Sequence, residues 1–412
     1  MNSKALNRIK PTISFIVHCS LFIVHCSLLL GCITEYHPKG LDEIANVLVV
    51  EGVITDDETL VILSRSINLT EVVVTDSYIR NARVYVESDD GASFDAENNN
   101  DGTYTVFNGK LDTERMYRLK IILGSHVYYS EYSQPILTPE ITDVFWTKRG
   151  RGQPVLINVS TQSVDNQILY YRWSYREDWE YTADFFWHVP ERCQNPVCAA
   201  ELPADKDNCP QCGATIVKSY PFYCWGRSTN RGFIISSAER TTFGRVIEQI
   251  AEIVPADARL AMLYRITVKQ NAISKQAYEY FTSVRKYSQD MGSIFSPVIS
   301  ELNGNIICIT DRDRPAIGYV EVSTTAQRSL YISQSDDLYE APDIFKLCTP
   351  LTEIEICARL RLSMHCHLWK ITDDYILYDY DPHSHQPRYI DVYCVDCTLY
   401  GGVTEKPDDW KK

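Results

Sequence analysis

This sequence has fewer basic residues than acidic residues. Lysine and arginine number 40 against 54 aspartate and glutamate residues, which gives a formal net charge of −14 and a pI near 5.2. Nucleic acids are bound through basic stripes that neutralise phosphates. This composition therefore argues against a nucleic-acid partner.

Long apolar runs are missing beyond residue 30, and so are catalytic motifs. No later segment approaches the roughly 20 apolar residues that span a bilayer. We find no Ser/His/Asp arrangement, no His-Glu-x-x-His helix and no paired carboxylates that specify a reaction. We therefore expect a protein that is not an enzyme. An extracytoplasmic hydrolase or a redox enzyme is the alternative.

The one long apolar segment opens the chain and ends in a lipobox. A basic stretch precedes the apolar residues 13–30, and Leu29-Leu30-Gly31-Cys32 places a small residue directly before a cysteine. The pattern predicts a lipoprotein signal peptide over residues 1–31 and acylation of Cys32. An uncleaved transmembrane anchor is the alternative. Ile33 is not the aspartate that typically retains lipoproteins in the inner membrane, so we expect the outer membrane, on either its periplasmic or its cell-surface face.

The mature body of about 380 residues is longer than one hydrophobic core usually covers, so we expect two domains. Residues 32–44 form a polar tether, and residues 45–138 are predicted to form an N-terminal β-sandwich. Residues 139–328 are predicted to form a second β-rich domain. Residues 329–412 are a C-terminal extension with weaker patterning.

Tyrosine, present 27 times, often alternates with valine, isoleucine and threonine, which predicts a mainly β protein. The expected strands cover residues 47–54, 60–64, 82–87, 103–107, 117–123, 127–130, 141–146, 155–160, 169–175, 264–270, 306–309 and 316–324. The last two should complete the second domain. Residues 98–102 should form a hairpin turn with left-handed backbone, and calcium binding there is a weaker alternative.

Two further patterns belong to the second domain. Ser274 caps one helix, whose apolar stripe runs to about Ser288. The aromatic residues 170–175 alternate as in a strand, and we interpret them as sandwich core in preference to a binding stripe for a sugar or a hydrophobic ligand.

The chain has 14 cysteines. Three belong to the signal and the anchor (Cys19, Cys26 and Cys32), which leaves 14 − 3 = 11 in the body. An exported protein is expected to form disulfides. Because 11 is odd, at least one cysteine stays unpaired or several bind a metal.

Four cysteines in an insertion over residues 190–219 resemble a zinc ribbon. Cys193 and Cys198 are followed, after ten residues, by Cys209-Pro210-Gln211-Cys212-Gly213. Such a turn points both thiolates to one side, and a second pair completes a tetrahedral Zn²⁺ site with no open position, so the metal would be structural. The first pair has four intervening residues where two are usual, and export favours disulfides. Two disulfides or free thiols are therefore the alternatives.

A second cysteine pair, Cys394 and Cys397, lies in the C-terminal extension. A Cys-x-x-Cys pair can be redox-active, but nothing around it resembles the strand-to-helix context of thioredoxin. We expect a structural disulfide, either between these two residues or to Cys348, Cys357 or Cys366.

Taken together, the lipobox and several scattered motifs resemble the DUF4249 family of Bacteroidetes lipoproteins of unknown function. The motifs are Leu48-Val49-Val50-Glu51-Gly52-Val53-Ile54-Thr55, Tyr171-Arg172-Trp173 with Trp179, Tyr223-Cys224-Trp225, Gln270 leading into Ala277-Tyr278-Glu279-Tyr280, Gly304-Asn305 before Gly318-Tyr319, and Cys394-Val395-Asp396-Cys397 followed by Gly401-Gly402, Pro407 and Trp410. The resemblance implies immunoglobulin-like or carboxypeptidase-regulatory-like β domains. It also implies an outer-membrane lipoprotein usually encoded beside a TonB-dependent transporter, and it implies no activity.

We therefore expect a lipid-anchored binding accessory to a TonB-dependent transporter, with a ligand that the sequence does not name. A structural or adhesive surface module is a further alternative.

Overall fold

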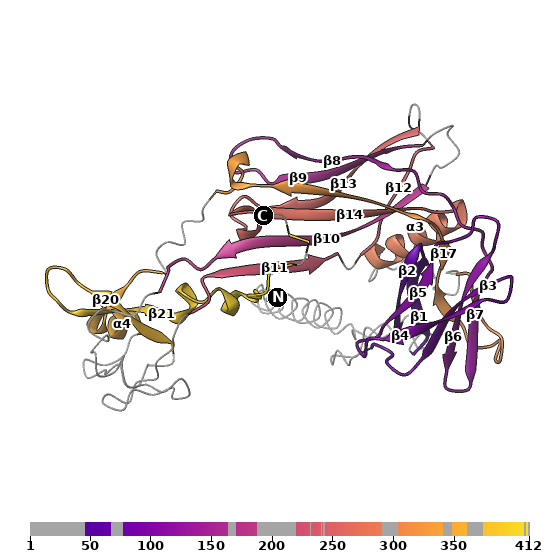
Figure 1. Ribbon diagram of the computed structural model, residues 1–412, viewed down its shortest axis with the longest axis horizontal. Helices are drawn as coiled ribbons and strands as arrows, with labels where there is room; N and C mark the ends of the chain where they lie inside the picture. Colours follow the sequence, from indigo (N-terminus) through magenta and orange to yellow (C-terminus); the bar gives the residue numbers. More distant parts are fainter. Residues whose placement is uncertain are drawn as a thin grey trace, which may run out of the picture. The chain divides into compact units, whose positions relative to one another are not determined.

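The computed structural model describes residues 46–66, 77–163, 170–187, 220–230, 232–239, 241, 244–290, 304–340, 348–360, 374–407 and 409–410. Two compact units divide the chain: Met1–Asn46 with Ser66–Ser77, and Val47–Arg65 with Tyr78–Lys412. The second unit is mainly β (Figure 1). No helix in the described ranges has the length and apolar character needed to cross a membrane.

The N-terminal strands form a ten-stranded sheet. Its order is β15-β7-β6-β3-β4-β5-β2-β1-β16, and β17 also pairs with β1. The bounds are β1 (Leu48–Ile54), β2 (Asp57–Arg65), β3 (Arg83–Ser88), β4 (Ser93–Asn98), β5 (Thr103–Gly109), β6 (Tyr117–Leu123), β7 (His126–Ser130), β15 (Ile306–Cys308), β16 (Ala316–Gly318) and β17 (Glu321–Val322).

Alternation along these strands explains how the sheet packs. In β3 and β6, Val84 opposes Ile121 and Val86 opposes Leu119, and all four side chains are buried. Side chains from β1, β2 and β5 join the same core, so the two halves of the sheet pack face to face as a sandwich.

The turn between β4 and β5 has the predicted left-handed backbone, with φ of 63° at Asn100 and 93° at Gly102. The side chains of Asn98 and Asp101 accept hydrogen bonds from the backbone N–H groups of Asn100 and Thr103, each at 2.9 Å. β4 itself is not among the expected strands. Its side chains are mostly exposed, so it lacks the apolar alternation that identifies a strand.

The structure differs from the prediction for residues 306–309 and 316–324. Instead of completing the second domain, β15 pairs with β7, and β16 and β17 pair in parallel with β1. Strand edges carry unpaired N–H and C=O groups that need partners. Periodicity identifies a strand but does not say which edge it will cover.

The second domain contains two facing sheets. One has the order β11-β10-β14-β18, with β12 also on β10, and the other has the order β13-β9-β8. The bounds are β8 (Ile141–Lys148), β9 (Val155–Gln162), β10 (Tyr170–Thr182), β11 (Tyr223–Thr229), β12 (Ile234–Ser237), β13 (Arg245–Ile253), β14 (Tyr264–Ala272) and β18 (Thr325–Ile332). Tyr171 and Trp173 are fully buried between the sheets. The interpretation of the aromatic strand as core is therefore confirmed.

The predicted helix is α3 (Lys275–Asp290). The Ser274 hydroxyl accepts a hydrogen bond from the Ala277 N–H at 3.1 Å, which caps the first turn. Ala277, Tyr280 and Phe281 are buried on one face of the helix. The periodicity and the cap were sufficient to predict this element.

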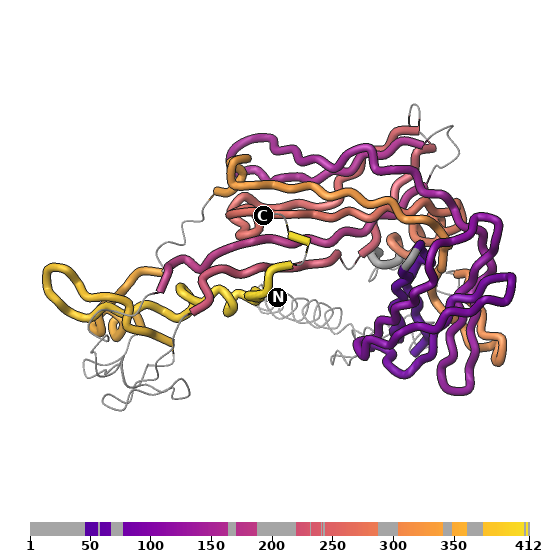
Figure 2. Tube along the Cα trace, in the orientation of Figure 1, coloured from indigo at the N-terminus to yellow at the C-terminus, as the bar shows by residue number. Residues whose placement is uncertain are grey.

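The C-terminal extension has its own small structure. It contains β19 (Leu351–Thr352), α4 (Glu353–Arg359), β20 (Tyr375–Tyr380), β21 (Pro387–Asp391) and two short 3₁₀ turns, η8 (Val392–Cys394) and η9 (Cys397–Tyr400). The sheet order is β19-β21-β20. Beyond η9 the chain pairs with β11 through a bridge between Trp225 and Val403. Figure 2 shows the yellow C-terminal part of the trace running along the sheet of the second domain.

Candidate functional site

Several predicted site residues lie outside the described residues. They are the lipidation site Cys32 and the four candidate zinc ligands Cys193, Cys198, Cys209 and Cys212. Lipidation and zinc binding therefore stay predictions.

Cys394 and Cys397 lie in η8 and η9 and are both disulfide-bonded, but not to each other. Cys394 pairs with Cys348 and Cys397 with Cys224, with S–S distances of 2.06 and 2.14 Å. Cys348 was among the partners that the sequence offered, whereas Cys224 was not. Cys224 is separated from Cys397 by 173 residues, so only the fold brings the two together.

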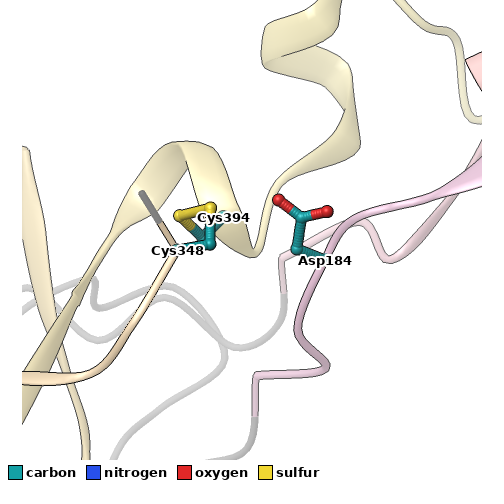
Figure 3. Close-up of side chains that lie close together, drawn as sticks. All are labelled: Asp184, Cys348 and Cys394. Carbon is teal, nitrogen blue, oxygen red and sulfur yellow. A yellow bond between two sulfur atoms is a disulfide. The ribbon is translucent and has the colours of Figure 1, made fainter. Parts of the chain in front are cut away.

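Asp184 lies beside the Cys348–Cys394 disulfide (Figure 3). Its carboxylate and the two sulfur atoms lie within 4.8 Å of one another, a grouping that could hold a metal ion. The sulfurs are bonded to each other, however, and metals bind thiolates, so this group could act as a metal site only after reduction. Although Asp184 reaches solvent, the surrounding protein removes part of its hydration and raises the pKa of its carboxyl.

A buried ionic cluster lies on the sheet that also carries Cys224. The Asp178 carboxylate of β10 is fully buried and accepts hydrogen bonds from Arg227 at 2.7 Å, Arg265 at 2.8 Å and Arg176 at 3.0 Å. Burial disfavours the charged form, but the hydrogen bonds from Arg227 and Arg265 and the charge of Arg176 outweigh it, so the pKa of Asp178 is lowered. Asp409 adds a second carboxylate, 2.9 Å from Arg265.

The last residues of the chain complete this cluster. The Trp410 ring lies against Arg265, with 5.4 Å from the guanidinium carbon to the ring centroid. Gly402 lies so close to Tyr181 and Cys224 that an added methyl group would overlap the Tyr181 hydroxyl. We call residues 394–410 the C-terminal clamp.

The contacts of the clamp explain why the C-terminal motif contains cysteine, glycine, proline and tryptophan. Its two cysteines form separate disulfides, and Gly401 ends η9 in the left-handed region with φ of 84°. The backbone N–H of Trp410 donates to the Pro407 carbonyl at 3.0 Å. Chemically, these groups are paired with one another, so the clamp is suited to fastening the chain end to the sheet.

Sequence reasoning did not find the ionic cluster. Asp178 sits within a strand rich in aromatic residues, and its partners are Arg176 of β10 itself, Arg227 of β11 and Arg265 of β14. A buried charge inside a strand pattern was the only available signal, because charged residues are rarely buried without partners.

The comparisons place the chain in a family. The family profile described as "Domain of unknown function (DUF4249)" matches residues 33–329, so the chain belongs to the DUF4249 family, as its motifs suggested. The match ends before the C-terminal clamp. No curated protein matches the sequence.

Among solved structures, one chain from the structure of manganese lipoxygenase of Gaeumannomyces graminis and zonadhesin of Komagataella pastoris is similar at 9% identity. The alignment covers 57% of this chain and 90% of that chain, with a TM-score of 0.15. A similarity this weak carries no argument about fold or function.

Proposed function

We propose that this protein is an outer-membrane lipoprotein that binds a ligand as an accessory to a TonB-dependent transporter. The observation that supports a location outside the cytoplasm is the state of the cysteines. Of the six cysteines in the described ranges, five are disulfide-bonded and the sixth, Cys308, is buried. Disulfides persist in oxidising compartments, which agrees with export through the lipobox at Cys32.

The transporter is proposed because of the resemblance described above. A lipid-anchored protein of β-sandwich domains has no route of its own across a membrane. If the role is uptake, the body must contact a protein that has such a route.

Affinity purification from gently solubilised outer membranes tests this part. The tagged protein should recover a TonB-dependent barrel in near-equal amount. The matched control is the Cys32→Ser variant, which should lose membrane attachment and recover the barrel less well. Recovery of the lipoprotein alone, in several detergents, would favour the structural or adhesive alternative.

The redox alternative has one observation in its favour, the Asp184 carboxyl beside the Cys348–Cys394 disulfide. A carboxyl with a raised pKa can accept a proton from a thiol during disulfide exchange. Mild reduction followed by alkylation tests it. A redox role requires Cys348 and Cys394 to be labelled well before Cys224 and Cys397, and simultaneous labelling would count against it.

A further inference from the structure

Arg172 of β10 occupies an unusual position for a charged side chain. Its neighbours Tyr171 and Trp173 are buried between the two sheets of the second domain. Successive side chains on a strand point to opposite faces, so Arg172 lies on the other face of β10. On that same face Tyr170 contacts Tyr278 of α3, with ring centroids 5.0 Å apart.

Two aromatic rings flank the guanidinium group. The Arg172 guanidinium carbon lies 5.0 Å from the ring centroid of Phe281 in α3 and 5.9 Å from that of Phe233. The two rings are themselves in contact, with centroids 4.8 Å apart. The charge therefore sits in a surrounding of aromatic groups.

Arg172 has no matching carboxylate in the part of the chain that the structure describes. Arg118, Arg259 and Arg265 each donate to a carboxylate, whereas the interactions found for Arg172 are the two ring contacts. Glu51 of β1 acts on it only through space. Burial lowers the pKa of the guanidinium, although an arginine stays charged at any ordinary pH.

A partly buried charge that has no carboxylate partner among the described residues needs an explanation. Contacts with aromatic rings stabilise a cation by less free energy than its removal from water costs. Arg172 is nevertheless only half-buried as a residue, so part of it remains open to solvent. A guanidinium group offers five N–H donors in a planar fork that fits a carboxylate with two parallel hydrogen bonds.

We propose that Arg172 is the anion-binding residue of a site for an organic acid, in which the guanidinium group holds the carboxylate and the Phe233 and Phe281 rings contact the apolar body. The inference rests on the proposed function, because it names the ligand class of the binding accessory. The test of the Arg172 site requires no transporter, so ligand binding and the partnership with the transporter can fail separately.

Isothermal titration of the full mature chain with benzoate tests the site. Benzoate should bind at up to millimolar concentration, and benzamide, which has the same shape without the charge, should bind at least about tenfold more weakly. Acetate, which lacks the ring, should also bind more weakly. Absence of benzoate binding to the wild type, or equal binding of benzoate and benzamide, overturns the proposal.

Substitutions assign the binding to this residue. Arg172→Met should reduce benzoate affinity at least about tenfold, and Arg172→Lys, which keeps the charge without the fork, should reduce it less. Glu51→Gln should increase affinity because it removes a competing negative charge. Arg328→Met, at an exposed arginine on β18, should bind benzoate like the wild type.

Thermal unfolding without ligand separates this role from a structural one. If Arg172 serves a ligand, Arg172→Met removes an unpaired charge and should unfold no lower than the wild type. A variant that unfolds well below the wild type, while Arg172→Lys binds benzoate with unchanged affinity, would assign the residue to packing and overturn the proposal.

Discussion

Asp178 is the residue on which the buried ionic cluster depends most, because three arginines donate to its carboxylate. Replacing it with Asn removes the buried carboxylate that three arginines share, and Arg265, which is only 2% exposed, keeps Asp409 as its remaining carboxylate. Removing one partner of a buried ion pair costs about 3–5 kcal/mol, because the other charge stays buried. Because Arg265 stays paired with Asp409, we expect Asp178→Asn to lower the free energy of unfolding by up to about that amount in denaturant titrations.

The matched control is Asp143→Asn. Asp143 pairs with Arg328 at 3.4 Å on the surface, where both side chains are about half exposed. Such pairs contribute about 0–1 kcal/mol. Equal losses in the two variants would contradict the importance of the cluster.

The wild type should also lose the contribution of Asp178 to the free energy of unfolding as pH falls below the ordinary pKa of 3.8, since the pKa of Asp178 is lowered in the folded protein.

For Glu321 the stability depends on pH in the opposite direction, because its pKa is raised and not lowered. It is buried on β17, and its carboxylate accepts hydrogen bonds from the Ser274 N–H at 2.9 Å and the Ser274 hydroxyl at 2.7 Å. Burial raises its pKa above 4.5 despite these bonds. Between 4.5 and the raised value, the folded protein holds a proton that the unfolded chain has lost. The free energy of unfolding therefore falls as pH rises through this window.

Glu321→Gln removes this dependence. We expect the variant to unfold at a higher temperature than the wild type at pH 7, and the difference to shrink as pH is lowered toward 4.5. Glu355→Gln is the control. Its stability difference from the wild type should change with pH in the opposite direction, because hydrogen bonds from Thr352 lower the pKa of Glu355. A gain in Glu321→Gln that is the same at every pH would show that the carboxyl is not its source.

At the scale of elements, the Cys224–Cys397 disulfide ties the clamp to β11. The bond closes a loop of 173 residues, and in the chain-entropy account the loss of so long a cross-link costs about 4–5 kcal/mol. The double variant Cys224→Ser/Cys397→Ser should unfold at a lower temperature, and limited proteolysis should remove the chain end first.

A second variant tests the seating of the clamp without touching the disulfide. Gly402→Ala should have a similar but smaller effect, because the methyl group would overlap Tyr181. Gly150→Ala is the control, since nothing lies within 4 Å of its added methyl group. If Gly402→Ala is as stable and as protease-resistant as Gly150→Ala, the close contact is not needed.

The insertion over residues 190–219 carries a separate prediction. Cys193, Cys198, Cys209 and Cys212 should bind about one Zn²⁺ per chain in tetrahedral geometry. Elemental analysis of protein purified without reducing agent measures it. Little zinc, with these cysteines blocked to alkylation until reduction, would mean two disulfides. Because such a site is structural, Cys212→Ser should increase proteolysis within the insertion and leave the rest of the second domain folded.

For the molecule as a whole, the sequence predicted what local patterns determine. The mainly β class, the helix after Ser274, the turn at residues 98–102 and the buried aromatic strand all follow from periodicity, capping and turn chemistry over a few neighbouring residues. They required no knowledge of distant partners.

The features that sequence reasoning missed depend on residues far apart in the chain. The Cys224–Cys397 disulfide, the Arg265–Asp409 ion pair and the pairing of β16 with β1 each join segments more than a hundred residues apart. β4 was missed for a different reason, because its surface is polar. Arg172 likewise has no carboxylate partner within the described ranges, and this became visible only when its surroundings were known.

Membrane attachment is the prediction that concerns the whole molecule. If Cys32 is acylated, the mature chain is held at the membrane by its lipid, and more than one acyl chain is needed for stable attachment. Cys32→Ser should leave a slower-migrating precursor or release the protein from membranes. Metabolic labelling with a fatty-acid probe should mark the wild type and not the variant. Cys308→Ser, which alters a buried free cysteine, is the matched control and should be labelled normally. Labelling of Cys32→Ser at the wild-type level would place the lipid elsewhere and remove the basis for an anchor at this residue.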